Sequence, residues 1–146
     1  MRRISRRRAF GAALTTCGVL ALTGCGADRT ETPSSALADM TSFARLVDSD
    51  EFADMVAQPG RVTINVHVPF EGDIAGTDLS IPFDQIDANA GRLPADRSTG
   101  LAIYCRSGPM STIAAETLHN LGYTDVVELR GGMRAWQADG HPLIGT

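Results

Sequence analysis

Apolar positions in the last two thirds of the chain follow two different periods. Over residues 62–68, apolar residues alternate with polar ones, and this period of two predicts a strand. Residues 101–104 and 126–129 predict two further strands, and residues 77–83 predict a short one. We therefore expect at least four strands in this part of the chain.

Segments with helical signals separate the strands. Asp48 and Glu51 form a capping-box pattern, which predicts a helix that ends at Pro59 and Gly60. Residues 84–90 predict one or two helical turns. A loop after residue 104 leads to a longer helix that ends near residue 120. The residues that recur at helical spacing in that helix are Ile113, Thr117, Leu118 and Leu121.

A short helix after Gly131 and Gly132 completes the pattern, with Met133 and Trp136 as expected core residues. Strands and helices thus alternate over residues 43–146, and these 104 residues suffice for one domain. Such alternation predicts an α/β fold with a largely parallel sheet that helices cover on both faces. Ligand sites in these sheets lie at the carboxyl ends of the strands.

The first 24 residues have the pattern of an export signal. Five arginines lie between residues 2 and 8, an apolar stretch runs over residues 10–22, and no acidic residue occurs. The stretch is shorter than the roughly 20 residues that a membrane-spanning helix needs. Residues 1–24 therefore predict a signal peptide, which includes Cys17.

The end of this signal predicts lipid attachment. Leu22-Thr23-Gly24-Cys25 resembles the lipobox of bacterial lipoproteins, in which the cysteine is lipidated on sulfur and the signal is removed just before it. Residues 25–42 are polar and predict a flexible, lipid-anchored tether, which places the domain at the extracytoplasmic face of the cell membrane. The neighbouring Arg7 and Arg8 resemble a twin-arginine motif, so that route and the general secretory route both stay open.

Removal of the signal changes the charge of the protein. The full chain has 13 basic and 17 acidic residues, whereas residues 25–146 keep 8 basic and 17 acidic ones, a net charge of −9. Nucleic acid is not expected as a partner, because phosphate binding requires a basic surface. An anionic small molecule would need local attraction, for which Arg106, Arg130 and Arg134 are the candidates.

Cys105 follows the strand at residues 101–104 and opens a loop that leads into a helix. Unpaired N–H groups and the helix dipole would stabilise a thiolate at this place, and the thiolate is the reactive form of cysteine. The alternative is a small buried hydrophobic residue. Because Cys17 and Cys25 belong to the signal and the lipid site, Cys105 is the one thiol of the folded part and has no disulfide partner there.

Three sequence blocks resemble the rhodanese family. They are "VTINVHVPFEGDIAGTDLSIPFDQI", the active-site loop "YCRSGPMS", and "VVELRGGMRAW" followed by "GHPL". The resemblance spans most of residues 43–143 and implies a five-stranded parallel sheet flanked by helices. It also implies a sulfurtransferase, in which Cys105 takes a sulfane sulfur from a donor as a persulfide and passes it to an acceptor.

The resemblance further implies which residues and partners take part. The loop residues that would bind the substrate are Arg106, Ser107, Gly108, Pro109, Met110 and Ser111. The donor would be thiosulfate, a polysulfide or a thiol persulfide, and the acceptor cyanide, a small thiol or a thiol protein. Asn65 and His67 are candidate supporting residues, but they stand where the family usually has Asp and Arg. Asp73 stands where a His is frequent, and Met110 where many loops have Arg.

These departures keep two other functions in view. A non-catalytic module that binds or senses oxidants or sulfur species would tolerate the changes at Asn65, His67 and Met110. A phosphatase or arsenate reductase of related fold requires a longer loop that ends in Arg, whereas Ser111 stands at that place. We therefore expect a sulfurtransferase, with the sensing module as the alternative.

The three histidines do not form a metal-binding pattern. His67, His119 and His141 have no ligand spacing with Cys105, and no Gly-rich phosphate loop occurs, so the sequence predicts neither a metal nor a cofactor. We expect His119 and His141 at the surface. His67 is expected near the carboxyl edge of the sheet, either as a structural residue or as one that tunes Cys105.

The lipid anchor can be tested directly. Metabolic labelling with palmitate should mark the full-length protein, and the substitution Cys25→Ala should abolish the label and release the protein from the membrane fraction, since the acceptor sulfur is removed. An unlabelled wild-type protein, or a membrane-bound Cys25→Ala variant, would contradict the anchor.

Overall fold

The computed structural model describes residues 42–146. The signal peptide, Cys25 and almost all of the predicted tether lie outside the described residues. Within the described range, no helix has both the length and the apolar character that crossing a bilayer requires.

A five-stranded parallel sheet forms the centre of the domain, as the sequence predicts. Its strands lie in the order β1-β6-β5-β2-β4, and every neighbouring pair is parallel. Their bounds are Arg45–Val47 for β1, Val62–Asn65 for β2, Leu79–Ser80 for β4, Leu101–Tyr104 for β5 and Val126–Leu129 for β6. Since β5 is central, its carboxyl end, which Cys105 follows, lies between the ends of β2 and β6.

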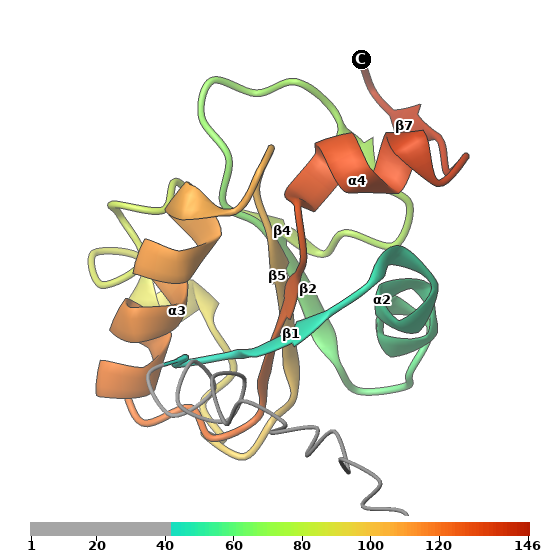
Figure 1. Cartoon of the computed structure of the whole chain (residues 1–146). Coiled ribbons are helices and arrows are strands. Elements are labelled where there is room, and N and C mark those ends of the chain that lie inside the picture. Colours follow the sequence, from blue (N-terminus) through green and yellow to red (C-terminus); the bar gives the residue numbers. More distant parts are fainter. Residues whose placement is uncertain (1–41) are drawn as a thin grey trace, which may run out of the picture. The chain divides into compact units, whose positions relative to one another are not determined.

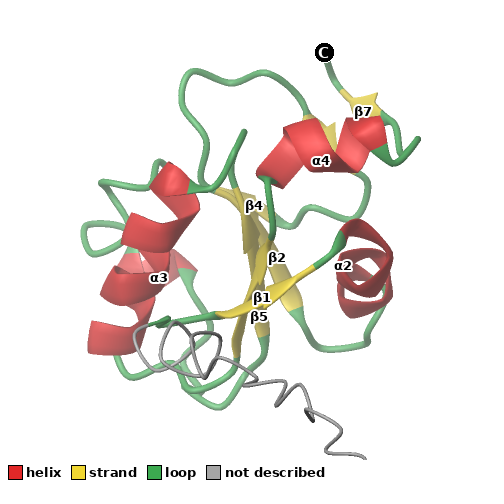
Figure 2. Cartoon of the chain, in the orientation of Figure 1, coloured by secondary structure: helices red, strands yellow, loops and turns green. Residues whose placement is uncertain are grey.

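Helices cover both faces of this sheet. Helix α3 (Pro109–Asn120) lies on one face, and α2 (Ser49–Val56) and α4 (Gly132–Ala138) lie on the other (Figure 1). A short 3₁₀ helix (Ala90–Arg92) precedes β5. Outside the main sheet, β3 (Asp73–Ile74) pairs with β7 (Leu143–Ile144) in an antiparallel arrangement (Figure 2). The three-layer arrangement leaves the carboxyl edge of the sheet as the place where loops from both sides meet.

Each face of the sheet has its own apolar core. The core under α3 contains Ile64, Ile103 and Leu118, and the core under α2 and α4 contains Phe52, Val127 and Trp136. Met133 also belongs to the second core, so the expected burial of Met133 and Trp136 is confirmed. Burial of apolar area on both faces is the main favourable contribution to the stability of such a fold.

The packing of α3 differs from the expected one. Ile113 is exposed, and the buried residues of α3 are Ser111, Ala114, Ala115 and Leu118. Of the four residues predicted at helical spacing, Leu118 is buried and Leu121 packs against the core, whereas Ile113 is exposed. Small side chains at the other buried positions let the helix lie close to the sheet. The helix begins at Pro109, which suits the first helical turn because no intrahelical N–H bond is needed there.

Strand β2 is shorter than predicted, and three short strands, β1, β3 and β7, were not foreseen. The side-chain Oδ1 of Asn65 accepts a hydrogen bond from the backbone N–H of His67 at 2.9 Å, which turns the chain out of the ladder. Strand β1 has only three residues, so it leaves no periodic signal. The capping box at α2 forms by half: Asp48 accepts from the N–H of Glu51 at 2.9 Å, but the carboxylate of Glu51 pairs with Arg45.

The N-terminus of α4 contacts the loop that follows β5. The backbone N–H of Met133 donates to the carbonyl of Cys105 at 2.9 Å, and that of Arg134 donates to the carbonyl of Arg106 at 3.1 Å. Gly132 has a φ of +60°, and a Cβ atom there would lie 2.3 Å from the carbonyl oxygen of Cys105. Only glycine therefore allows this approach.

The substitution Gly132→Ala should push the loop and α4 apart. We expect the free energy of unfolding to fall by about 2–4 kcal/mol, since steric overlap adds to the cost of a left-handed backbone. Urea denaturation measures this change. Gly91→Ala is the matched control, because a Cβ atom there meets nothing within 4 Å and the change should stay within about 0.5 kcal/mol. Equal losses in the two variants would contradict the role of this contact.

Candidate active site

Cys105 lies at the end of β5 with its sulfur turned into the fold. The residue is 1% exposed, and its Sγ accepts a hydrogen bond from the backbone N–H of Gly108 at 3.1 Å. The hydroxyl of Ser111, in the first turn of α3, lies 3.3 Å from the same sulfur. A negative charge on Sγ would therefore meet donors that the fold already holds in position.

Gly108 allows the loop to turn in this way. Its φ is +118°, a region that residues with a Cβ atom rarely adopt, and it is the residue that directly precedes α3. The predicted loop residues thus divide into two groups. Gly108 and Ser111 contact Sγ, whereas the others lie around a cavity next to it.

A cavity of about 210 Å³ opens beside Cys105. Four of the predicted loop residues and one predicted supporting residue line it together with the thiol. These are Arg106, Ser107, Pro109, Met110 and His67. The structure therefore brings the candidate nucleophile and most of the candidate binding residues together, while Arg130 and Arg134 are exposed and do not line this cavity.

A neighbouring carboxylate compensates the positive charge of Arg106. Its guanidinium forms an ion pair with Glu71, and the other carboxylate oxygen of Glu71 lies 3.4 Å from Nε2 of His67. His67 is 7% exposed, and neither of its ring nitrogens makes a hydrogen bond within the described residues. The cavity thus has a compensated positive charge and, at His67, an unused hydrogen-bonding group.

Asn65 supports the segment that carries these residues. Its amide donates to the carbonyl of Gly72 at 3.0 Å and to a carboxylate oxygen of Asp73 at 2.8 Å. The hydroxyl of Tyr104 also donates to Asp73, at 3.2 Å, and accepts from the N–H of Ile74 at 3.0 Å. Burial is the main cause that raises the pKa of Tyr104, so it remains a hydrogen-bond donor. Asn65 and Asp73, which both depart from the family pattern, are thus hydrogen-bonded to each other.

Glu128 is a residue of this site that the sequence analysis missed. It lies on β6, is 3% exposed, and accepts hydrogen bonds from Ser111 at 2.7 Å and Thr112 at 3.2 Å. Burial raises the pKa of Glu128, while the two hydrogen bonds partly oppose that shift. An acidic residue inside an otherwise apolar strand was the available signal, because isolated charges are rarely buried.

The other two histidines lie away from Cys105. His119 is exposed, as expected, and its ring lies 5.2 Å from that of Phe43. His141 is partly buried instead of fully exposed, because it stacks on Trp136 at a centroid distance of 4.1 Å. Among residues 42–146, no three side chains of the usual metal-binding types are grouped to hold an ion.

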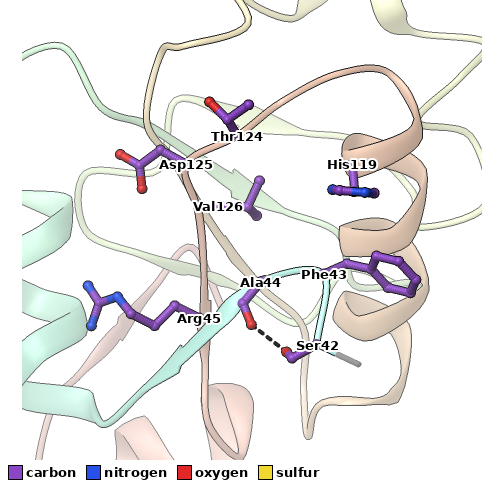
Figure 3. A pocket seen from close by; sticks show the side chains of 8 residues that line it. All are labelled: Ser42, Phe43, Ala44, Arg45, His119, Thr124, Asp125 and Val126. Atoms are coloured by element: carbon purple, nitrogen blue, oxygen red, sulfur yellow. Dashed lines mark hydrogen bonds between the residues drawn. The ribbon is translucent and has the colours of Figure 1, made fainter. Parts of the chain in front are cut away.

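A larger cavity of about 570 Å³ lies elsewhere, beside β1 and the end of α3 (Figure 3). Its lining includes Arg45, His119 and Asp125, and the figure shows Asp125 and His119 on opposite sides of Val126. Its lining contains no cysteine, and its two hydroxyl residues are Thr124 and Ser42, which donates to the carbonyl of Ala44. The smaller cavity is therefore the candidate active site on chemical grounds.

Comparison with known proteins identifies the family of this chain. The family model of the Rhodanese-like domain matches residues 32–139. A protein named sulfurtransferase from Allochromatium vinosum is 33% identical over 102 residues, which cover 67% of this chain and 92% of that protein. The probable adenylyltransferase/sulfurtransferase MoeZ of Mycobacterium tuberculosis is 35% identical over 83 residues, but the matched part is only 21% of its length and 54% of this chain.

Solved structures show the same fold. The rhodanese-related protein from Thermoplasma volcanium has a TM-score of 0.58 and 26% identity, with 68% of this chain and 97% of that chain covered. The rhodanese-like domain protein from Staphylococcus aureus has a TM-score of 0.56, 26% identity and the same coverage. With its five-stranded parallel sheet and the matched family model, this chain belongs to the rhodanese-like domain family.

Proposed function

We propose that this protein is a sulfurtransferase that carries a sulfane sulfur as a persulfide on Cys105. The observation that carries the proposal is the position of Sγ, which borders the cavity and has the N–H of Gly108 and the hydroxyl of Ser111 beside it. Membership in the family and the similarity to proteins named sulfurtransferase support the reaction class. For MoeZ, which is much longer than the matched part, only that matched part bears on the proposal.

The reaction would proceed in two halves. The Cys105 thiolate attacks the outer sulfur of the donor, a bond forms between Sγ and that sulfur, and the donor leaves with the electron pair of the broken bond. An acceptor nucleophile then attacks the outer sulfur, and Cys105 leaves as a thiolate. A covalent intermediate divides one difficult transfer into two easier ones. The donors around Sγ stabilise the charge in both halves without rearrangement.

The charges around the cavity favour a donor of low charge. Glu71 compensates Arg106, Met110 adds an apolar wall, and His67 contributes an unused ring nitrogen. We infer that a thiol persulfide is a better donor than thiosulfate or an inorganic polysulfide, because both of the latter are dianions and the ion pair weakens the attraction of a dianion. A small thiol or a thiol protein is then the natural acceptor, and cyanide is a test acceptor.

The alternative is a module that only senses oxidants or sulfur species. The slight exposure of Cys105 and the pairing of Arg106 favour it, since both restrict the access of an anionic donor. The two functions differ in turnover: a sensor reacts once with its ligand, whereas an enzyme passes the sulfur on repeatedly.

We also propose that the protein acts at the membrane. Lipidation of Cys25 would hold the domain at the extracytoplasmic face through a tether of residues 25–42. This placement would give Cys105 access to thiols and sulfur compounds outside the cytoplasm.

Cys105 can be tested as the sulfur carrier. After incubation of the full-length protein with thiosulfate or a small thiol persulfide, peptide mass spectrometry should find one added sulfur on Cys105. The substitution Cys105→Ala should lower the rate of sulfur transfer to cyanide or to a thiol by at least about a thousandfold, since the nucleophile is lost. A sulfur on Cys105 without repeated turnover would support the sensing module, and no added sulfur with any donor would refute both the carrier and the enzyme.

The pairing of Arg106 makes a prediction about donor choice. The substitution Glu71→Gln should raise kcat/KM for thiosulfate about threefold to fivefold relative to a thiol persulfide, because Arg106 is freed and a nearby negative charge is removed. Glu51→Gln is the matched control, since Glu51 pairs with Arg45 outside the cavity and its loss should leave the ratio unchanged. An unchanged ratio in Glu71→Gln would show that this ion pair does not select the donor.

A further inference from the structure

The buried carboxyl group of Glu128 lies one hydroxyl group away from the sulfur of Cys105. Ser111 Oγ is 2.7 Å from Oε1 of Glu128 and 3.3 Å from Sγ. All three groups are buried, and Glu128 has no ion-pair partner among the described residues. Cys105, Ser111 and Glu128 therefore form a row of hydrogen-bonding groups that connects the reacting sulfur with a buried acid.

The hydroxyl group of Ser111 has one proton to share among several possible acceptors. The hydroxyl lies within hydrogen-bond distance of three acceptors, namely Sγ, Oε1 of Glu128 and the carbonyl of Gly108 at 2.8 Å, yet it can donate fully to only one. When Glu128 is ionised, the charged acceptor attracts the proton most strongly. The oxygen of Ser111 then presents a lone pair to the sulfur and can accept the proton of the thiol.

We propose that Glu128 accepts the proton of Cys105 through Ser111 and returns it when the sulfur has been passed on. In the forward step the S–H proton moves to Oγ of Ser111 while the hydroxyl proton moves to Oε1 of Glu128. The result is a thiolate and a neutral carboxyl group, with no change in total charge. In the return step Cys105 leaves as a thiolate, and the same two proton movements reverse.

The stored proton helps the sulfur chemistry for an electrostatic reason. A neutral Glu128 removes a negative charge from the buried side of the loop at the moment when Sγ or the persulfide becomes negative. Burial also raises the pKa of Glu128, which makes its carboxylate a stronger proton acceptor than an exposed one. Glu128 is a positioning residue in this scheme, since it acts on the sulfur only through Ser111.

Other charges around Glu128 are few or compensated. In the sheet register, β5 places Ile103 and β1 places Leu46 opposite Glu128, and neither carries a charge. Arg106 is paired with Glu71, and His67 lies across the cavity. Tyr104 on β5 is buried with its hydroxyl bound to Asp73 and Thr77. The other titratable side chains on β1, α3 and α4 are exposed. These exposed residues are Arg45 on β1, Glu116 and His119 on α3, and Arg130 and Arg134 next to and on α4. Glu128 is therefore the buried acid that Ser111 connects with Cys105.

The rate of Cys105 alkylation by iodoacetamide, measured against pH in the full-length protein, tests the proposal. In the wild type, two coupled groups share one proton, so the profile should show two ionisation steps with a reactive shoulder at low pH. The substitution Glu128→Gln keeps the size and shape of the side chain but removes its ionisable group, so the pH profile should show one ionisation step. At a pH between the two steps, alkylation should be about tenfold faster in Glu128→Gln than in the wild type, because the neutral amide no longer opposes the thiolate, as expected for one unit of coupling.

Two variants in α3 distinguish the proposed proton relay, from Cys105 through Ser111 to Glu128, from a purely structural role of Glu128. Ser111→Ala breaks the connection between the sulfur and the carboxyl group, and it should also leave one step. Thr112→Val is the matched control, because Thr112 binds Glu128 at 3.2 Å without contacting Sγ, so it should keep two steps. A wild-type profile with one step, or two steps in Ser111→Ala, would refute the relay.

The relay rests on the proposed sulfur transfer, but the two can fail separately. Alkylation needs no sulfur donor, so a two-step profile in a protein that never forms a persulfide would overturn the proposed function alone. Sulfur transfer in a protein with a one-step profile would overturn the relay alone. The relay further requires that the pH profile of sulfur transfer change from two steps in the wild type to one step in Glu128→Gln, and an unchanged two-step profile in that variant would count against it.

Discussion

Two backbone hydrogen bonds from the N-terminus of α4 to the carbonyl groups of Cys105 and Arg106 hold the active-site loop in place. Because peptide groups are planar and trans, carbonyl groups that point toward α4 turn the next N–H groups of the loop away from it. Gly132 permits this contact, since any side chain at its position would overlap with the loop backbone. Gly131 and Gly132 and the loop that begins at Cys105 therefore belong to one structural unit.

Polar residues form a connected layer beneath this loop. Ser111 and Glu128 lie on the side of α3, and Asn65, Asp73 and Tyr104 lie around the end of β2 and β5. Their buried donors and acceptors bind one another, which avoids the cost of unsatisfied polar groups. His67 is the exception among them, because neither of its buried ring nitrogens makes a hydrogen bond within the described residues.

The chemistry of the site follows from charge as much as from the nucleophile. Arg106, next to Cys105, would by itself attract dianions, but Glu71 compensates it from a loop that the sequence analysis did not connect with it. Glu128 adds a second acidic group from the opposite side of Cys105. An acidic domain thus surrounds its thiol with one paired cation and with hydrogen-bond donors from the backbone and Ser111, an arrangement that stabilises one negative charge better than two.

Much of this molecule could be predicted from local patterns in the sequence. Residues 101–104 and 126–129 form β5 and β6 as predicted, and Cys105 opens a loop into a helix, because strand periods, turn residues and helix signals act over short distances. Short strands such as β1 and the outward position of Ile113 were not predictable in this way, since packing against the sheet decides them. Glu71 and Glu128 lie 35 residues before Arg106 and 17 residues after Ser111, and only the parallel sheet brings them to the thiol. The sequence by itself determined the candidate nucleophile, its loop and the order of the main elements, whereas the tertiary structure decided which charges lie near that thiol, because contacts between distant residues depend on the arrangement of the strands.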